Sequence, residues 1–221
     1  MNALLHADSV LEPHLCIPNF NGFLTSATAC HRRRPPDRFG GVFVKEGKII
    51  RGLKRIATPG FVISLYYWWR FGARVSSRAE VDLTPNLTFG RNCRIEAFSK
   101  IKCSEGVLSF GDRAKVAAGC FITSGAGETH IGDDFRCGPN VNIVGQNYIH
   151  SEKGKNLEDL GIKSVGIRIG NGVMIGAGTT IVDGAAIGHN SLVLPNSLVN
   201  RRYPEGAILG GNPAKLQREE K

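Results

Sequence analysis

The chain has 221 residues, of which 42% are hydrophobic, and it carries a formal net charge of +9. This length and apolar content suit one domain with an appended segment, and they exclude a wholly disordered chain. Glycine contributes 28 residues, which is about twice its usual share. Because the 10 prolines are an ordinary number, the glycine excess indicates neither collagen nor a low-complexity coil.

The charge is concentrated near the N-terminus. Residues 1–79 contain 12 basic and 4 acidic residues, whereas residues 80–221 contain 16 basic and 15 acidic residues. We therefore divide the chain into a basic and aromatic arm, residues 1–79, and a nearly neutral domain that follows it. Such an arm either meets an anionic partner or is simply a solvated basic surface. No motif of a nucleic-acid-binding module accompanies the charge, so we expect no nucleic acid.

An aromatic stretch, FVISLYYWW at residues 61–69, contains both tryptophans of the chain. It is too short to span a bilayer. Aromatic residues beside basic ones suit a membrane interface, so residues 31–74 are a candidate for peripheral membrane contact. The alternative is a short helix that packs on the main domain. The start of the chain lacks a signal-peptide pattern and the six cysteines form no CxxC pair, so we expect a cytoplasmic protein with reduced cysteines in its core.

From position 89 onward an apolar residue recurs every six residues, with two phase shifts of three residues. The period covers fifteen positions, Phe89, Ile95, Ile101, Phe110, Val116, Ile122, Ile131, Cys137, Ile143, Ile169, Ile175, Ile181, Ile187, Val193 and Val199. A glycine often follows directly, as at Gly90 and Gly170. Neither a helix nor an alternating strand has this period.

A six-residue period predicts a triangular solenoid, in which each hexad forms one short strand and a corner. The apolar side chain points into the prism, and the next position needs a small residue or one that tolerates an unusual φ. We expect the two insertions to bulge at corners near residues 107–109 and 125–127. The solenoid covers residues 80–209.

A long interruption runs through residues 144–166, where the period is lost. A loop of this length inside a compact solenoid is usually functional. After the last hexad, residues 210–221 are predicted to form a turn and a short C-terminal helix, with Asn212 as its N-cap and Pro213 as its first residue.

Residues 80–216 resemble the hexapeptide-repeat acyltransferases, and most of all the sugar O-acetyltransferases of polysaccharide and lipopolysaccharide biosynthesis. The resemblance is carried by the hexads, the long loop, the hexad GVMIGAG at residues 172–178 and the closing GNPAK at residues 211–215. It implies an all-β fold, the left-handed parallel β-helix, and a homotrimer. It also implies a CoA-dependent O-acyltransferase that moves an acetyl group from acetyl-CoA to a hydroxyl of a sugar or glycan precursor.

In this family a histidine of the loop deprotonates the acceptor hydroxyl, and a backbone N–H stabilises the oxyanion. Here Asn147 matches the family motif, but Tyr148 stands where the histidine is expected. A tyrosine is a poor base at neutral pH, by about 4–5 kcal/mol relative to histidine. His150 lies two residues later, and in an extended segment it faces the same side as Tyr148.

Three readings stay open for the catalytic candidates His150, Asn147 and Tyr148. In the first, His150 is the base of a working transferase. In the second, Tyr148 or no strong base acts on an unusual acceptor. In the third, the loop has lost its chemistry, and the protein is a trimeric scaffold or a ligand-binding protein.

The resemblance also assigns residues to the acetyl-CoA groove. Met174 replaces the family's tryptophan in the groove wall, and Ala177 and Gly178 would offer backbone groups to the pantetheine arm. The phosphates of CoA need cations, for which Lys215 and, at the last corner, Arg201 are candidates. The spacing of the histidines favours no metal site.

Overall fold

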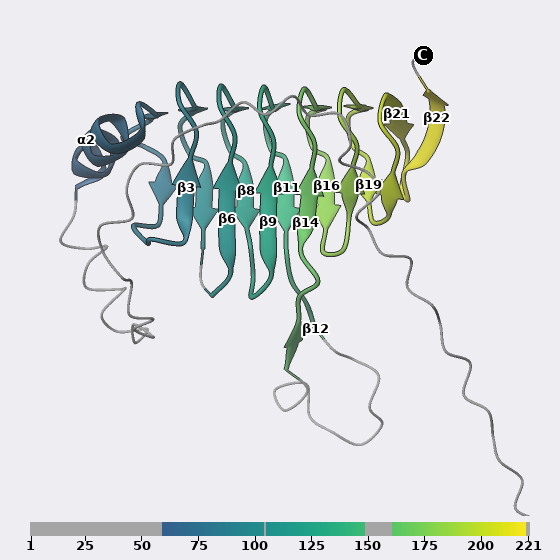
Figure 1. The fold of residues 1–221 in the computed structure, drawn as a ribbon, viewed down its shortest axis with the longest axis horizontal. Helices are drawn as coiled ribbons and strands as arrows, with labels where there is room; N and C mark the ends of the chain where they lie inside the picture. Colours follow the sequence, from purple (N-terminus) through teal and green to yellow (C-terminus); the bar gives the residue numbers. More distant parts are fainter. Residues whose placement is uncertain (1–58, 104, 149–160, 220–221) are drawn as a thin grey trace, which may run out of the picture. The chain divides into compact units, whose positions relative to one another are not determined.

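The computed structural model describes residues 59–103, 105–148 and 161–219. A helix, α2 (Gly60–Phe71), is followed by short strands that wind as successive coils of a triangular prism, as Figure 1 shows. Each coil places one strand on each of three sheets, here called faces A, B and C. Within a sheet, the strands of successive coils run parallel to one another. Residues 1–58, which make up most of the predicted arm, and residues 149–160 of the loop with His150 lie outside the described residues.

The strands of each face follow one another from coil to coil. Face A consists of β1 (Arg74–Val75), β4 (Arg94–Ile95), β7 (Lys115–Val116), β10 (Arg136–Cys137), β15 (Met174–Ile175), β18 (Leu192–Val193), β21 (Ala207–Gly210) and β22 (Lys215–Glu219). Face B consists of β2 (Glu80–Val81), β5 (Lys100–Lys102), β8 (Phe121–Thr123), β11 (Asn142–Val144), β16 (Thr180–Val182) and β19 (Leu198–Val199). Face C consists of β3 (Leu87–Phe89), β6 (Val107–Phe110), β9 (Glu128–Ile131), β14 (Ile167–Ile169), β17 (Ala186–Ile187) and β20 (Arg202–Tyr203).

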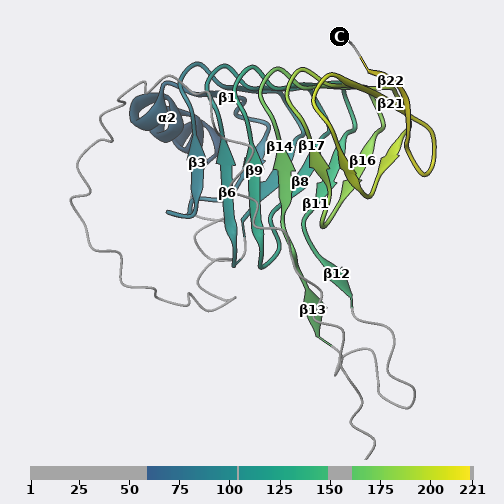
Figure 2. The same cartoon turned by 45° about the vertical axis from the view of Figure 1, so that its right-hand side comes forward.

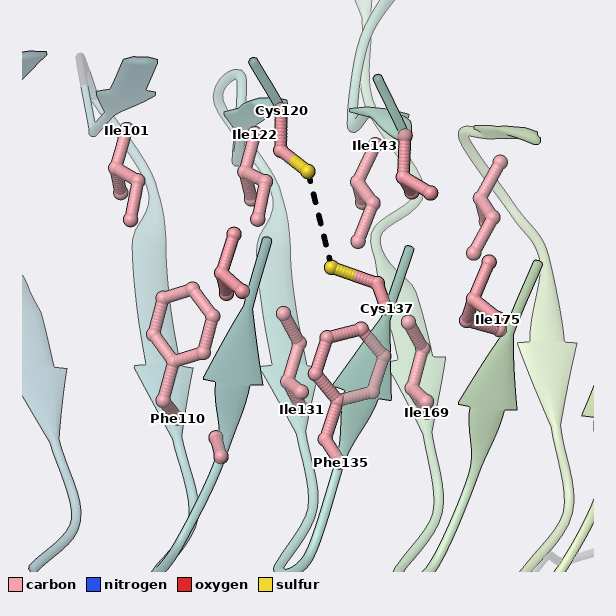
Figure 3. Packing of buried hydrophobic residues seen from close by; sticks show 14 of the residues in the cluster. Ile101, Phe110, Cys120, Ile122, Ile131, Phe135, Cys137, Ile143, Ile169 and Ile175 are labelled. Carbon is pink, nitrogen blue, oxygen red and sulfur yellow. Dashed lines mark hydrogen bonds between the residues drawn. The ribbon is translucent and has the colours of Figure 1, made fainter. Parts of the chain in front are cut away.

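The core of the prism includes every residue that the six-residue period selects. All fifteen positions are buried, the most exposed being Cys137 at 8%. Residues of one face stack in register, as Ile95 pairs with Val116 and Val116 with Cys137. Figure 3 shows inward side chains of successive coils, among them Ile101, Ile122 and Ile143, in the interior. Full burial of an isoleucine contributes about 1.5–3 kcal/mol, so the prediction of the core is confirmed and the period explains the stability of the coils.

The glycines that directly follow the inward residues are required by the approach of the next coil. A Cβ atom added to Gly90 would lie 2.3 Å from the backbone of Gly111, and one added to Gly170 would lie 2.7 Å from the backbone of His189. Neither glycine has a positive φ; the left-handed residue comes three positions after the inward one, as at Asn140 (φ 57°). The prediction of a small residue is confirmed, but the unusual φ belongs to another position.

Both insertions fall between an inward residue of face B and the next inward residue of face C. Residues 125–127 form a turn there, as predicted. The first prediction was wrong, because residues 107–109 belong to strand β6. Leu108 and Phe110 both point inward and are at most 4% exposed. The extra length therefore widens face C and buries a second side chain on that strand.

Helix α2 packs on the first coil through Tyr67, which is 1% exposed. The hydroxyl of Tyr67 donates to the backbone carbonyl of Asp82 at 2.7 Å, and its ring meets Phe89 edge to face at 5.0 Å. Strand β1 already pairs with β4, so face A begins before the predicted boundary at residue 80. No helix among the described residues is long and apolar enough to span a bilayer.

The predicted C-terminal helix is wrong. Residues 211–214 form a turn, which Tyr203 holds by donating its hydroxyl to the carbonyl of Ala214 at 2.7 Å. The chain then returns as β22, antiparallel to β21, with Gly210 opposite Lys215. The pairing satisfies the backbone groups at the edge of face A. A short isolated helix gains much less, because helix nucleation is costly.

The four described cysteines are free and buried, as predicted for small core residues. Burial raises the pKa of Cys93 from 9.0 to about 11. Cys120 and Cys137 lie on the same side of the prism interior with 3.8 Å between their sulfur atoms, the contact drawn in Figure 3. Cys16 and Cys30 lie outside the described residues.

Candidate active site

The long loop leaves the prism between faces B and C, after β11. Its two ends form an antiparallel ribbon of β12 (Asn147–Tyr148) and β13 (Ile162–Lys163), in which Asn147 pairs with Lys163 and Tyr148 with Ile162. Figure 2 shows this ribbon projecting away from the prism. Because Asn147 is exposed, its side chain is available to a ligand. His150 follows the ribbon and lies outside the described residues.

The returning end of the loop is fixed by a buried carboxylate. Asp183, 8% exposed, accepts hydrogen bonds from the backbone N–H of Val165 at 2.8 and 2.9 Å and of Gly166 at 2.7 Å. Hydrogen bonds to an ionised acceptor are about twice as strong as neutral ones. The next coil therefore holds the base of the loop in one position, which is a requirement for placing a catalytic side chain.

A second anchor joins the two ends of the loop to each other. The hydroxyl of Ser164 donates to the carbonyl of Gly145, and its oxygen accepts from the N–H of Gly127 at 2.8 Å. Neither Ser164 nor Asp183 was predicted from the sequence as a functional residue. In the sequence, Asp183 stands out only as an acidic residue between Val182 and Gly184. This position does not reveal its hydrogen-bond partners.

The residues assigned to the acetyl-CoA groove lie on other parts of the prism. Met174 is the outward residue of β15 on face A and is 50% exposed. Ala177 and Gly178 form the following corner, between faces A and B. The N–H of Gly178 donates to the carbonyl of Pro139 at 3.0 Å, and the carbonyl of Ala177 accepts from Asn196 at 2.9 Å. The Gly178 N–H is thus engaged, while the Ala177 carbonyl keeps a second lone pair.

The two predicted cations are also separated. Lys215 is exposed on β22, within the sheet that carries Met174. Arg201 is exposed between β19 and β20. This connection joins faces B and C, so Arg201 lies on the same edge of the prism as the loop, two coils further on.

Within one chain, the predicted site residues therefore lie on two different sides of the prism. Asn147, Tyr148 and Arg201 lie at the edge between faces B and C, whereas Met174 and Lys215 lie on face A. In a triangular prism, face A is opposite that edge. The structure does not bring the two groups together within a single chain.

Two other histidines, His130 and His189, occupy outward positions. His130 lies on face C, where Nδ1 is 2.7 Å from the hydroxyl of Ser109 and Nε2 is 3.1 Å from the carboxylate of Glu128. His189 accepts a hydrogen bond from the N–H of Asn171 at 2.9 Å. Among residues 59–103, 105–148 and 161–219, no group of three or more His, Cys, Asp or Glu side chains is placed to hold a metal ion.

Comparison with known proteins agrees with the geometry of the coils. Residues 166–201 match the family described as bacterial transferase hexapeptide (six repeats). No curated protein matches the chain in sequence.

Several solved structures share the fold. AntD, an N-acyltransferase from Bacillus cereus in complex with dTDP and 3-hydroxybutyryl-CoA, has a TM-score of 0.59 at 19% identity, over 68% of this chain and 81% of AntD. The hexapeptide-repeat acetyltransferase VCA0836 from Vibrio cholerae O1 biovar eltor, complexed with acetyl-CoA, has a TM-score of 0.50 at 21% identity, over 82% of this chain and 94% of VCA0836. PerB from Caulobacter crescentus, in complex with CoA and GDP-perosamine, has a TM-score of 0.52 at 18% identity, over 79% of this chain and 68% of PerB. These matches confirm the predicted left-handed parallel β-helix.

Proposed function

We propose that the protein is a CoA-dependent O-acyltransferase that moves an acetyl group from acetyl-CoA to a hydroxyl of a sugar or glycan precursor. The acceptor hydroxyl gives its proton to His150, and its oxygen attacks the thioester carbonyl. The carbon–sulfur bond breaks, CoA leaves as the thiolate, and His150 returns the proton to the sulfur. The products are an acetyl ester and CoA.

The anchored loop is the observation that carries this proposal. A ribbon with Asn147 at its start, fixed by Asp183 and Ser164, projects from an otherwise regular β-helix. AntD, VCA0836 and PerB share that β-helix, and their structures contain acyl-CoA or CoA, with nucleotides or a nucleotide sugar in two of them. A rigid ribbon places a base against such a donor, which is the main requirement of acyl transfer.

The division of the site between two sides of the prism supports the proposed homotrimer. A closed ring of three copies brings the loop of one subunit against the part of face A that carries Met174 and Lys215 on the next, in a head-to-tail contact that closes after three subunits. Acetyl-CoA then lies between Met174 and Lys215 of one chain and the loop of its neighbour. Sedimentation equilibrium of the full chain tests this assembly, and a monomer at micromolar concentration contradicts it.

The exposed side of α2 supports peripheral contact with the inner face of a membrane, where a cytoplasmic enzyme of polysaccharide biosynthesis would meet lipid-linked precursors. Its residues Phe61, Leu65, Trp68 and Trp69 follow one helical stripe and are 58–80% exposed. Arg70 adjoins them. Tryptophan beside arginine is typical of an interfacial helix. Binding to anionic vesicles should decrease on Trp69→Ser and with salt; unchanged binding contradicts the assignment.

Thiol release from acetyl-CoA, measured with a panel of sugars that includes an amino sugar, tests the reaction. His150→Ala should reduce the rate by about 10²–10⁴-fold, the usual contribution of a general base. His189→Ala is the matched control and should keep the rate. Loss of activity in Tyr148→Phe instead identifies Tyr148 as the base. Absence of acetyl-CoA binding by the wild-type protein favours the scaffold.

A further inference from the structure

The outward side of face A carries a row of four basic side chains. Arg74 pairs in register with Arg94, Arg94 with Lys115, and Lys115 with Arg136. All four are exposed. Because adjacent coils are separated by about 4.8 Å, the row is straight and about 14 Å long. We call these four residues the cationic ladder.

The other two faces have no comparable row. At the corresponding coils, the outward residues of face B are Glu80, Lys100, Phe121 and Asn142, and those of face C are Thr88, Ser109, His130 and Arg168. Like charges directly opposite one another on neighbouring strands are destabilising. The cationic ladder is therefore costly to the fold and is confined to one face, so a structural role does not account for it.

Neighbouring acidic residues do not neutralise most of the positive charge of the cationic ladder. Within the described residues, Arg94 contacts Glu96 at 3.9 Å, a weak and exposed pair, and no salt bridge involves Arg74, Lys115 or Arg136. The corner acid Asp134 is hydrogen-bonded to Arg113 at 2.7 Å, and this contact, with a smaller contribution from the charge of Arg136, lowers the pKa of Asp134.

The position of the ladder relates it to the proposed site. The next outward residue on face A after Arg136 is Met174, which the proposed function places in the wall of the acetyl-CoA groove. At its other end, the ladder borders an open hollow of about 380 Å³ lined by residues that include Arg74, Ser76, Arg94 and Glu96. A linear ligand that follows the ladder thus leads directly to the reacting centre.

We propose that the cationic ladder binds a linear acidic glycan, with one carboxylate on each sugar, and delivers one of its hydroxyls to the site beside Met174. This inference rests on the proposed function for the identity of the acceptor as a sugar. The rise from one coil to the next, about 4.8 Å, is close to the length of one pyranose unit, so the cations repeat along the ladder at about the interval of the sugars. Arginine and lysine both form charge-assisted hydrogen bonds with carboxylates. CoA fits the ladder less well, because its charges are gathered at one end.

Binding of a galacturonate hexamer to the full chain, measured by calorimetry without acetyl-CoA, tests the ladder independently of the reaction. We expect binding that weakens with salt and with shortening to the dimer, and no binding of the neutral maltohexaose. The double variant Lys115→Gln/Arg136→Gln should bind about tenfold more weakly, which corresponds to about 1.4 kcal/mol. The control Lys100→Gln/Arg168→Gln removes the same charges from faces B and C and should bind within twofold of wild type.

Three results overturn the proposal: no binding of the hexamer to wild type, equal losses in the two double variants, or loss of acetyl-CoA binding in the ladder variant. Without binding of the hexamer, the ligand is not an acidic glycan. Equal losses would mean that only the net charge matters, and loss of acetyl-CoA binding would mean that the ladder binds the acyl donor. If the hexamer binds as expected but no sugar supports thiol release, the proposed reaction fails while the ladder stands. The thermal midpoint of the ladder variant should not fall, because the substitution relieves repulsion, and this excludes misfolding as the cause.

Discussion

Replacing Asp183 with asparagine tests whether the base of the loop is held by the next coil. The carboxylate of Asp183 accepts from two backbone donors, the N–H groups of Val165 and Gly166, at 2.7–2.9 Å. Each hydrogen bond to an ionised group contributes about 1.5–3 kcal/mol, against about 0.5–1.5 kcal/mol for a neutral one. Asparagine keeps the shape but has no charge and only one accepting oxygen. The expected loss is therefore about 2–3 kcal/mol.

The loss should appear first as local opening of the loop. In wild type, hydrogen exchange should be slow at the amides of Val165 and Gly166, and in Asp183→Asn it should be faster by about 30- to 150-fold, which is the same free energy expressed as an opening constant. Thiol release should fall because the ribbon is no longer fixed. The core amide of Ile175 should keep its protection, since the coils do not depend on this contact.

Asp134→Asn is the matched control, because it makes the same chemical change in an exposed ion pair with Arg113. Exposed ion pairs contribute little to stability, so this variant should leave both loop exchange and thiol release unchanged. If Asp183→Asn also leaves the exchange of Val165 and Gly166 unchanged, the carboxylate does not anchor the loop and the reasoning is refuted.

Three further predictions concern the fold. Tyr67→Phe removes the hydrogen bond to the Asp82 carbonyl and should lower the free energy of unfolding in urea by about 1–2 kcal/mol; an unchanged midpoint contradicts the contribution of this hydrogen bond to the packing of α2 on the first coil. Phe98 has a φ of 62° and is 65% exposed. Phe98→Gly should therefore raise the free energy of unfolding by about 1 kcal/mol through relief of backbone strain. A lower free energy of unfolding would instead show that the ring of Phe98 contributes by packing. Burial raises the pKa of Cys93 from 9.0 to about 11, so above pH 9 the unfolded chain releases a proton that the folded chain retains, and stability falls. Wild type should lose up to about 2 kcal/mol more than Cys93→Ala between pH 8.5 and 11, and equal losses would contradict the assignment.

The coils were predictable from sequence because their constraint is local and repeated. Each inward position, such as Ile143 or Ile181, occupies the same environment one coil later, and the same residue type recurs for the same physical reason. The loop was visible as the place where this repetition stops. Its end points, and the presence of Asn147 at its start, could therefore be located before the structure.

The errors have a common cause, which is pairing between distant parts of the chain. The C-terminal segment after Pro213 has a local pattern that suits a helix, but β21 offers an open edge and β22 pairs with it. Asp183 is separated from Val165 by 18 residues, and only the spacing of the coils brings them together. The cationic ladder is likewise invisible as a run, because Arg94, Lys115 and Arg136 are each 21 residues apart.

The opposite placement of the loop and face A makes a quantitative prediction about mixed oligomers. A His150→Ala subunit lacks the base but keeps face A, and a Met174→Glu subunit keeps the loop but places a carboxylate in the proposed groove wall. If each site is built from the loop of one chain and face A of its neighbour, neither variant alone is active. After unfolding and refolding an equal mixture, about one site in four combines an intact loop with an intact face A, since the two halves are drawn independently from two kinds of subunit. Thiol release should therefore recover to about a quarter of the wild-type rate. A site formed within one chain gives no recovery at any mixing ratio, so this single measurement separates the two arrangements.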